Sequence, residues 1–316
     1  MPAYLAVLLA AVCFGTTGTA QAFAPAGAEP VSIGAARILV GGALLALLAA
    51  VLRQRAGRDG RRSLAASGAL AHRMPSWALV FVGALGVVAY QPAFFAGTGS
   101  NGVAIGTVVA LGSAPVITGL LSWPLTRRAP TRRWLLATAV ALFGVVLISG
   151  VLVPQTSGAD GAQPAGLAAS LGAGASYAVY TLASKALLDR GFSTQGTMGS
   201  VFGLAAVLSL PLVVVPVLSG EAAWLATPAG LALALYLGVV TTAVAYVLFG
   251  WGLGRLPAAT VSTLTLAEPL TAALLGTLVL GEVLPPAALV GLVVLAAGLA
   301  LLTLPGRSQR STQAYS

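Results

Sequence analysis

Apolar runs of about 20 residues follow one another along almost the whole chain, and this feature limits the possible folds more than any other. A helix needs about 20 mostly apolar residues to cross the hydrocarbon core of a bilayer. Only 7% of the residues are charged and 58% are hydrophobic. A soluble domain carries about 25% charged residues. The sequence therefore predicts an all-α polytopic membrane protein whose main partner is the lipid bilayer.

Ten of these runs are predicted to be transmembrane helices. Their polar boundaries place them at about 4–24, 31–52, 77–96, 103–125, 133–153, 165–186, 196–217, 229–250, 257–279 and 287–304. An A-x-A pattern at 20–22 resembles a signal-peptide cleavage site, but no Lys or Arg precedes the first run. We therefore interpret the first run as a retained helix.

The basic residues indicate how the helices are oriented. With the N-terminus inside, every Lys and Arg except Arg37 falls in an inner connection or in the C-terminal tail. The outer connections carry only the acids Glu29, Asp160, Glu221 and Glu282. Positive charge is retained on the cytoplasmic side of membrane proteins, so both termini are predicted to be cytoplasmic and the protein to lie in the cell (inner or plasma) membrane. This distribution explains the net charge of +9 without a nucleic-acid partner.

One part of the chain resembles another. Segment 115–148 aligns without a gap with segment 269–302, and Pro and Gly residues match between them. The hairpin of the first copy carries Arg127-Arg128, whereas that of the second carries Glu282, so the two hairpins are predicted on opposite sides of the membrane. Inverted repeats are typical of secondary transporters. The predicted units are two inverted five-helix repeats and a cytoplasmic tail, at 1–153, 154–304 and 305–316.

The second half carries the most specific pattern, AATVSTLTLAEPLTAALLGTLVLGEVL, which GLVVLAAGLALL follows. This pattern resembles the ten-helix EamA-type exporters of the drug/metabolite transporter superfamily, and Arg37 in the second run fits it as well. The first copy departs from the family in having Arg128 where the second has Glu282. The resemblance implies a secondary carrier that exports small polar metabolites, with amino acids among them, by alternating access. It also implies a cavity lined by helices 1, 3, 4, 6, 8 and 9.

Other functions remain open beside this one. A nucleotide-sugar or phosphate-ester carrier of the same superfamily would need several basic residues within the membrane, and Arg37 alone is a weak basis for it. An intramembrane enzyme would need paired carboxylates, a Ser/His pair or metal ligands at depth. The only histidine, His72, lies in a connection, and Cys13 is the only cysteine. We therefore expect neither enzymatic activity nor a metal or other cofactor, and a monomer is the simplest expectation for the oligomeric state.

Two charged residues are predicted within the hydrocarbon, and each is a candidate for substrate binding because charges there are costly. Glu268 lies about 16 Å into the ninth run, near the midplane. It either exchanges a proton or holds a substrate ammonium group, or it is a structural acid bonded to a neighbouring helix. Arg37 lies about 9 Å from the outer end of the second run. Its stem is long enough to carry the guanidinium to the outer interface as an anchor.

Large or periodic polar residues complete the predicted substrate site. Tyrosines are the better candidates, because they offer both a ring face and a hydroxyl. Single Ser or Thr residues more often bond to another helix. Beside Glu268 and Arg37 the candidates are Tyr90, Gln91, Tyr177, Tyr180, Tyr246, Thr17 and Thr265. The segment 97–102 matches GxGxxG, but no strand precedes it, so it is interpreted as an outer turn.

Overall fold

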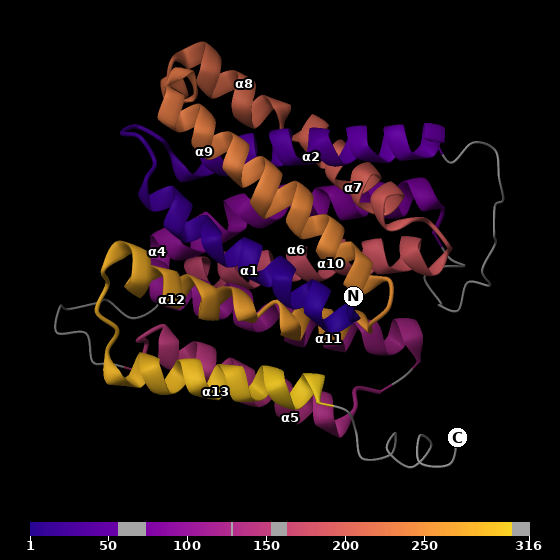
Figure 1. Cartoon of the computed structure of the whole chain (residues 1–316), viewed down its shortest axis with the longest axis vertical. Helices are drawn as coiled ribbons and strands as arrows, with labels where there is room; N and C mark the ends of the chain where they lie inside the picture. Colours follow the sequence, from indigo (N-terminus) through magenta and orange to yellow (C-terminus); the bar gives the residue numbers. More distant parts are fainter. Residues whose placement is uncertain (56–73, 128, 153–162, 305–316) are drawn as a thin grey trace.

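The computed structural model describes residues 1–55, 74–127, 129–152 and 163–304. Within these residues every regular element is a helix (Figure 1). Seven helical stretches in this part of the chain, some of which join successive helices, are long and apolar enough to cross a membrane. The prediction of an all-helical chain is therefore confirmed for the described residues. His72, Asp160, the tail at 305–316 and most of the arginine-rich connection lie outside them.

The helices follow the predicted runs closely, with the differences given below. The first half of the chain contains α1 (Ala3–Ala22), α2 (Pro30–Arg55), α4 (Ser76–Thr126) and α5 (Arg132–Ile148). The second half begins with α6 (Pro164–Asp189), α7 (Thr194–Leu208), α8 (Leu210–Ser219) and the 3-10 helix η1 (Ala223–Ala226). It continues with α9 (Pro228–Gly238), the π-helix η2 (Val239–Val244), α10 (Ala245–Leu253), α11 (Ala258–Leu264), α12 (Ala267–Leu280) and α13 (Pro286–Thr303).

The long helix α4 contains two of the predicted runs. At Gly102 the backbone takes φ 79° and ψ 157°, a conformation open to glycine because it has no Cβ. This residue separates a helical segment at 76–101 from another at 103–126. The interpretation of 97–102 as an outer turn is wrong, because residues 97–101 are helical and the interruption is confined to one glycine.

Two predicted runs end or divide differently from expectation. The seventh, at 196–217, is divided into α7 and α8 at Ser209. Pro211 follows in the first turn of α8 and cannot donate a backbone N–H to the preceding turn, which explains the division. The fifth run is predicted to continue to residue 153, but α5 ends at Ile148.

The helices pack side by side as a bundle. The most extensive contact joins α4 to α6, followed by α5 with α13 and α2 with α7, while α1 packs against α10 and α12. In Figure 1 the α2–α7 pair lies on one side of the bundle and the α5–α13 pair on the opposite side. Helices α1, α4, α6, α10, α11 and α12 lie between these two pairs. The centre of the bundle is therefore formed by helices that are distant in sequence.

Glycines bring the backbones together in both outer pairs. In the α5–α13 pair a Cβ added at Gly144 would lie 2.5 Å from the backbone nitrogen of Leu295, and one at Gly298 would lie 2.6 Å from that of Ala141. In the α2–α7 pair a Cβ at Gly199 would lie 2.6 Å from the carbonyl oxygen of Leu45. Small residues allow close backbone approach between membrane helices. Both pairs therefore rest on direct contact between backbones.

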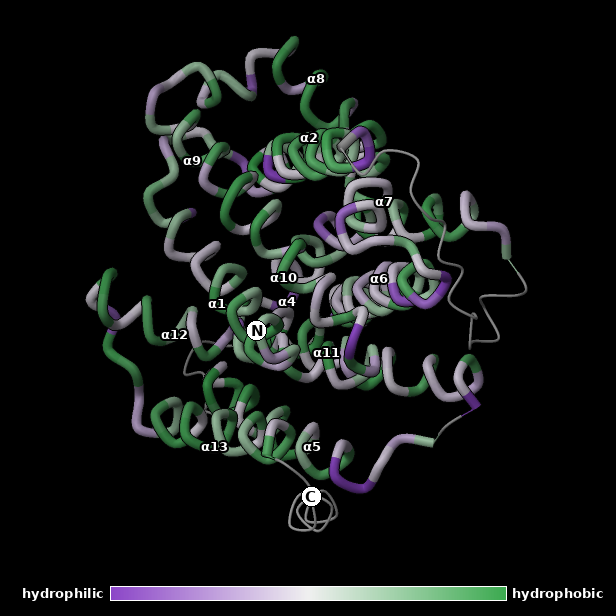
Figure 2. The backbone as a smooth tube through the Cα atoms, turned by 45° about the vertical axis from the view of Figure 1, so that its right-hand side comes forward, coloured by the Kyte–Doolittle hydropathy of each residue, from purple (hydrophilic) through white to green (hydrophobic). Residues whose placement is uncertain are grey.

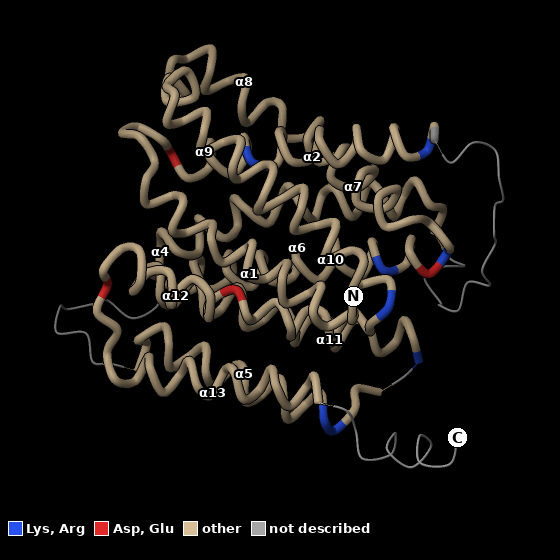
Figure 3. Tube along the Cα trace, in the orientation of Figure 1, with Lys and Arg blue, Asp and Glu red and all other residues tan. Residues whose placement is uncertain are grey.

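Apart from Arg37 and Glu268, the charged residues lie toward the two ends of the bundle (Figure 3), whereas its middle is mostly apolar (Figure 2). Lys and Arg gather at one end, with Asp189 among them, and the other acids lie at the opposite end. We call the basic end the one that carries the described residues Arg53, Arg127, Arg132, Arg133, Lys185, Arg190 and Arg255. The acidic end carries Glu29, Glu221 and Glu282. This segregation is the one that the sequence predicts for the two sides of a membrane.

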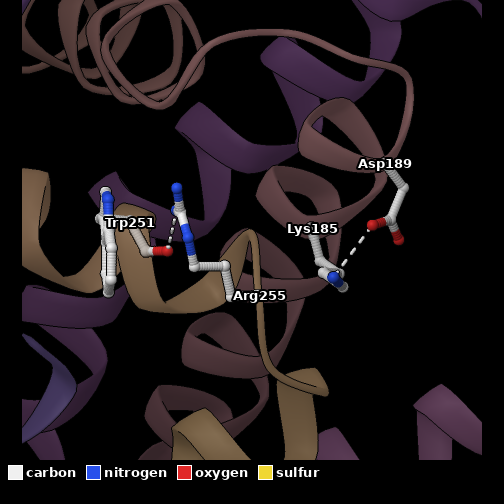
Figure 4. A network of polar contacts seen from close by, with 4 residues as sticks. All are labelled: Lys185, Asp189, Trp251 and Arg255. Carbon is white, nitrogen blue, oxygen red and sulfur yellow. Dashed lines mark hydrogen bonds and ion pairs between the residues drawn. The ribbon is translucent and has the colours of Figure 1, made fainter. Parts of the chain in front are cut away.

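Several basic side chains bind backbone carbonyls at the basic end. Arg133 donates from Nε to the carbonyl of Leu301 (2.7 Å), near the end of α13. Arg255 donates to the carbonyl of Trp251 (2.9 Å) and stacks 3.9 Å above its ring, and Lys185 pairs with Asp189 (2.9 Å), as Figure 4 shows. The last carbonyls of a helix have no partner within it, and cations near them are stabilising. These residues therefore close helix ends as well as bearing charge.

Candidate functional site

Two small adjacent chambers lie in the centre of the bundle. Their volumes are about 50 and 60 Å³. Both are lined by Arg37, Tyr90, Tyr180 and Tyr246. Ligand pockets usually measure about 300–1,000 Å³, whereas one water occupies about 30 Å³ of liquid. In this conformation the chambers therefore have room for a few water molecules and are too small for a larger solute.

The helices that line the chambers are those that the resemblance implied, with two additions. Phe14 comes from α1, Ala114 from α4, Tyr177 from α6, Tyr246 from α10 and Glu268 from α12. One addition is α2, which contributes Arg37 and Ile38, and the other is α7, which contributes Phe202. The chambers thus lie where helices from both halves of the chain meet.

Glu268 is placed at a break between two helices. The ninth predicted run was expected to be continuous, but α11 ends at Leu264 and α12 begins at Ala267. Pro269 lacks the N–H that would bond to the carbonyl of Thr265, and the N–H of Glu268 bonds to that carbonyl instead (2.9 Å). Glu268 therefore lies in the first turn of α12, where the helix dipole stabilises a carboxylate.

Arg37 is held by the π-helix η2. Its Nε donates to Oγ1 of Thr242 and its Nη2 donates to the carbonyl of Thr241, each at 3.0 Å. A π-helix changes the backbone bonding pattern and often marks a functional site. The expectation that the stem of Arg37 lifts the guanidinium to the outer interface is wrong, because these contacts keep it inside the bundle beside the chambers.

Arg37 and Glu268 face the same chamber but do not form a salt bridge. Among the described residues the one ion pair is that of Lys185 with Asp189, which is the pair drawn in Figure 4. Nitrogen and oxygen atoms of Arg37 and Glu268 are therefore more than 4.0 Å apart. The chamber thus holds two opposite charges at separate positions.

Aromatic rings form most of the wall between these charges. The rings of Phe202 and Tyr246 are closest, with centroids 4.0 Å apart, and Phe14 lies 5.0 Å from Tyr246. Tyr177 and Tyr180 meet edge to face at 5.1 Å. The hydroxyls bond to one another and to the broken helix: Tyr180 to Tyr246 (3.3 Å) and Tyr177 to Thr265 (2.9 Å). Such a wall offers ring faces and hydroxyls but no further charge.

The predicted site residues are brought together with one exception. Those that line the chambers are Glu268, Tyr90, Gln91, Tyr177, Tyr180, Tyr246, Thr265 and Arg37. Thr17 lines neither chamber, and its buried hydroxyl has no partner among the described residues. The structure thus groups eight of the candidates, and their roles in binding stay predictions.

Residues that the sequence did not single out also contribute. Phe14 and Phe202 line the chambers, but an apolar ring in an apolar run carries no signal that separates it from the core. Thr241 and Thr242 hold Arg37. Two adjacent hydroxyls in the middle of the eighth run were a usable signal for them, because polar residues at depth face a partner or a cavity.

A larger groove lies on the surface toward the acidic end. It measures about 480 Å³ and is lined by residues of α1, α9 and α12, among them Thr16, Phe23, Leu233 and Leu275. At its edge the hydroxyl of Tyr236 donates to Oγ1 of Thr16 (2.9 Å). Within the described residues no three His, Cys, Asp or Glu side chains come together in a way that would hold a metal ion.

The sequence matches the EamA-like transporter family over residues 1–150 and again over residues 164–304. The chain belongs to the EamA-like transporter family. The crystal structure of one protein shares the fold, with a TM-score of 0.74 over 99% of both chains at 20% identity. This EamA-like chain is therefore a membrane transporter.

Two named relatives of this EamA-like chain are informative. The uncharacterized transporter YwfM of Bacillus subtilis is 38% identical over 310 residues, which cover 98% of this chain and 96% of that protein. The threonine/homoserine exporter RhtA of Escherichia coli is 33% identical over 194 residues, which cover 60% of this chain and 59% of that protein. The family is thus shown over residues 1–150 and 164–304, whereas the relative with a named substrate matches 60% of the chain.

Proposed function

We propose that this EamA-like chain is a secondary transporter that exports small polar metabolites by alternating access, with amino acids as the leading candidates. The observation that carries the proposal is the pair of opposite charges, Arg37 and Glu268, at one interior chamber. Charges at this depth are costly and mark transport pathways. The threonine/homoserine exporters among the relatives make hydroxylated amino acids the first substrates to test. The proposed activity is transport without chemical change of the substrate.

The proposed architecture is ten transmembrane helices in two inverted repeats, at 1–153 and 154–304. The family match, which occurs once in each half, supports it. The packing supports it too, if α1 is equivalent to α6, α2 to α7–α8, the two parts of α4 to α9–α10 and α11–α12, and α5 to α13. Exchanging equivalents turns the contact of α4 with α6 into that of α1 with α9–α12. It leaves the α2–α7 and α5–α13 pairs unchanged. A superposition of the two halves about an axis normal to the membrane would contradict this architecture.

The basic end is proposed to be cytoplasmic, in the inner or plasma membrane, because arginine and lysine are retained there. Single cysteines introduced between residues 53 and 75, in a chain with Cys13→Ser, test this orientation. They should resist a membrane-impermeant thiol reagent added to intact cells, whereas Ala159→Cys should react. The reverse labelling pattern would place the basic end outside.

The transport proposal is tested by efflux from loaded cells. Cells that express the chain should lose threonine, homoserine or another amino acid of a panel faster than cells without it. Glu268→Gln should remove most of this efflux, because it removes the charge at the chamber. Glu282→Gln, which removes an acid at the exposed acidic end, is the matched control and should transport normally.

Two results would revise the proposal. If Glu268→Gln transports like the wild type at every pH tested, Glu268 is a structural residue and the site moves to the tyrosines of α4 and α6. If a phosphate ester in the same panel is exported and no amino acid is, the chain is a phosphate-ester carrier.

A further inference from the structure

The way η2 holds Arg37 fixes the direction of each hydrogen bond. The hydroxyl of Thr242 donates its one proton to the carbonyl of Leu237 (3.0 Å), so its lone pairs accept from Nε of Arg37. The carbonyl of Thr241 accepts from Nη2. Both acceptors therefore bind the edge of the guanidinium that carries the N–H of Nε and one N–H of Nη2. A guanidinium has five N–H groups, so the remaining ones, on Nη1 and Nη2, are without a partner among the described residues.

The unused N–H groups belong to a residue that lines both chambers. An arginine binds a carboxylate through two N–H groups at once, and this geometry is its most selective contact. The two bonds to η2 prevent the guanidinium from rotating, so this contact needs little further ordering. The remaining edge of the Arg37 guanidinium is thus positioned to bind an anionic group.

Glu268 presents the opposite charge to the same cavity from the N-terminal turn of α12. Since Arg37 and Glu268 lie more than 4.0 Å apart, neither neutralises the other through direct contact. Leaving two opposite charges unpaired at depth costs free energy. A solute that carries both an ammonium group and a carboxylate would relieve both costs and add no net charge.

We propose that Arg37, positioned by Thr241 and Thr242 of η2, is a carboxylate subsite, and that the cavity binds a zwitterion whose ammonium group meets Glu268. This assignment rests on the proposed transport function and adds to it which end of the substrate each side chain reads. Tyr90 and Tyr246, which line both chambers, contact the uncharged part of the solute. Thr242 is a positioning residue, since it acts through Arg37.

The first test compares three probes that differ in one charged group. L-threonine carries both charges, 1-amino-2-propanol lacks the carboxylate and 3-hydroxybutyrate lacks the ammonium group. In proteoliposomes with the wild-type chain, transport of L-threonine should saturate at a concentration about 10- to 100-fold lower than that of either probe, the loss expected for one charged hydrogen-bonding group. The same order should appear in the thermal stabilisation that each probe confers on the purified protein.

The variants give a crossed pattern. Arg37→Gln should weaken binding of L-threonine about 10- to 100-fold and leave 1-amino-2-propanol unchanged, whereas Glu268→Gln should leave 3-hydroxybutyrate unchanged. Thr242→Val should raise the KM for L-threonine but not for the amine, and Thr242→Ser should restore it. Thr138→Val, which removes a buried hydroxyl bonded to Thr263 (2.9 Å) away from the chambers, is the matched control.

Several results would overturn the assignment. It is wrong if the wild type handles the amine or the acid as well as the amino acid, or moves these probes and no zwitterion. It is also wrong if Arg37→Gln weakens the amine and the amino acid equally, because Arg37 would then act on structure alone. Transport of none of the compounds in the panel would instead contradict the proposed function itself.

Discussion

The contact of α4 with α6 and the contact of α1 with α9–α12 occupy equivalent places in the proposed repeat, yet they are built differently. The contact of α4 with α6 is held by side-chain hydrogen bonds at both of its ends. At the acidic end Asn101 bonds to both backbone groups of Gln163, accepting from its N–H (2.6 Å) and donating to its carbonyl (3.1 Å). At the basic end Arg190 donates to Oγ of Ser76 (2.9 Å) and to the carbonyl of Met74. Between these ends Gly97 lies directly against Ser170.

The second contact contains the irregular elements. The π-helix η2 and the break between α11 and α12 both belong to it. The groove of about 480 Å³ opens along it, and the bond of Tyr236 to Thr16 crosses it in an exposed position. Glu268 and the partners of Arg37 are on this side as well. The difference indicates that the regular contact is a fixed frame, whereas the irregular one carries the charges and can rearrange around a substrate.

Cross-linking is expected to give the largest effect. A chain with Cys13→Ser, Thr16→Cys and Tyr236→Cys should lose transport when a short bifunctional thiosulfonate reagent, which forms a disulfide with each cysteine, joins α1 to α9, because this contact is inferred to open in each cycle. Asn101→Cys with Gln163→Cys is the matched pair across the fixed contact, and its cross-linked form should still transport. Efflux from proteoliposomes measures both, before and after a reducible cross-link is cleaved. Loss of transport in the second pair alone would reverse the comparison.

The second largest effect is expected from overpacking the contact of α4 with α6. Gly174→Ala places a Cβ against Oγ of Ser113 and 2.9 Å from the carbonyl of Ala110, so it should destabilise the protein by about 1–3 kcal/mol. A lower Tm of the purified protein in detergent measures this. Gly18→Ala in α1 is the control, because its Cβ would meet nothing within 4 Å. A helical Gly→Ala change without a clash is neutral or stabilising by up to about 1 kcal/mol. Equal Tm values for the two variants would contradict the close packing of α4 with α6.

Removal of the hydrogen bonds between Asn101 and Gln163 at the acidic end should destabilise the protein less. Asn101→Ala removes two hydrogen bonds to an exposed backbone segment, and water replaces part of them. We expect a loss of stability of about 0.5–1.5 kcal/mol with the rate of efflux retained. A variant with normal Tm and impaired transport would mean that this end moves during the cycle.

The smallest effect is expected at the exposed bond of the irregular contact. Tyr236→Phe removes the hydroxyl that bonds to Thr16 and keeps the ring. Its Tm should change by less than that of Asn101→Ala, because it removes one exposed hydrogen bond whereas Asn101→Ala removes two. If the bond restrains opening, the efflux rate should rise. A fall in rate with unchanged Tm would indicate that the hydroxyl acts on the substrate instead.

The regular parts of the molecule were predictable because apolar length and charge location determine where a helix can cross a membrane. Glu268 and the tyrosines were predictable for the same reason, since large polar groups stand out in apolar runs. The break beside Glu268 was missed although Pro269 marks it. The π-helix was beyond prediction, because the residues of η2 are compatible with an ordinary helix and its contact with Arg37 comes from another helix, distant in sequence. Phe202 could not be assigned, because packing alone brings it to the site.

The two glycine-packed pairs have a mechanical consequence. In the proposed repeat, α2–α7 and α5–α13 are the contacts that map onto themselves, so the axis that relates the halves passes through both. Figure 1 places the two pairs on opposite sides of the bundle, so the axis crosses the bundle from one pair to the other. A movement of α1 relative to α9–α12 about this axis would be smallest at the two pairs and would grow with distance along each helix. Backbones that touch through Gly144, Gly199 and Gly298 have no long side chains to disengage there. The helix ends of the irregular contact can thus move apart while the two glycine-packed pairs stay assembled.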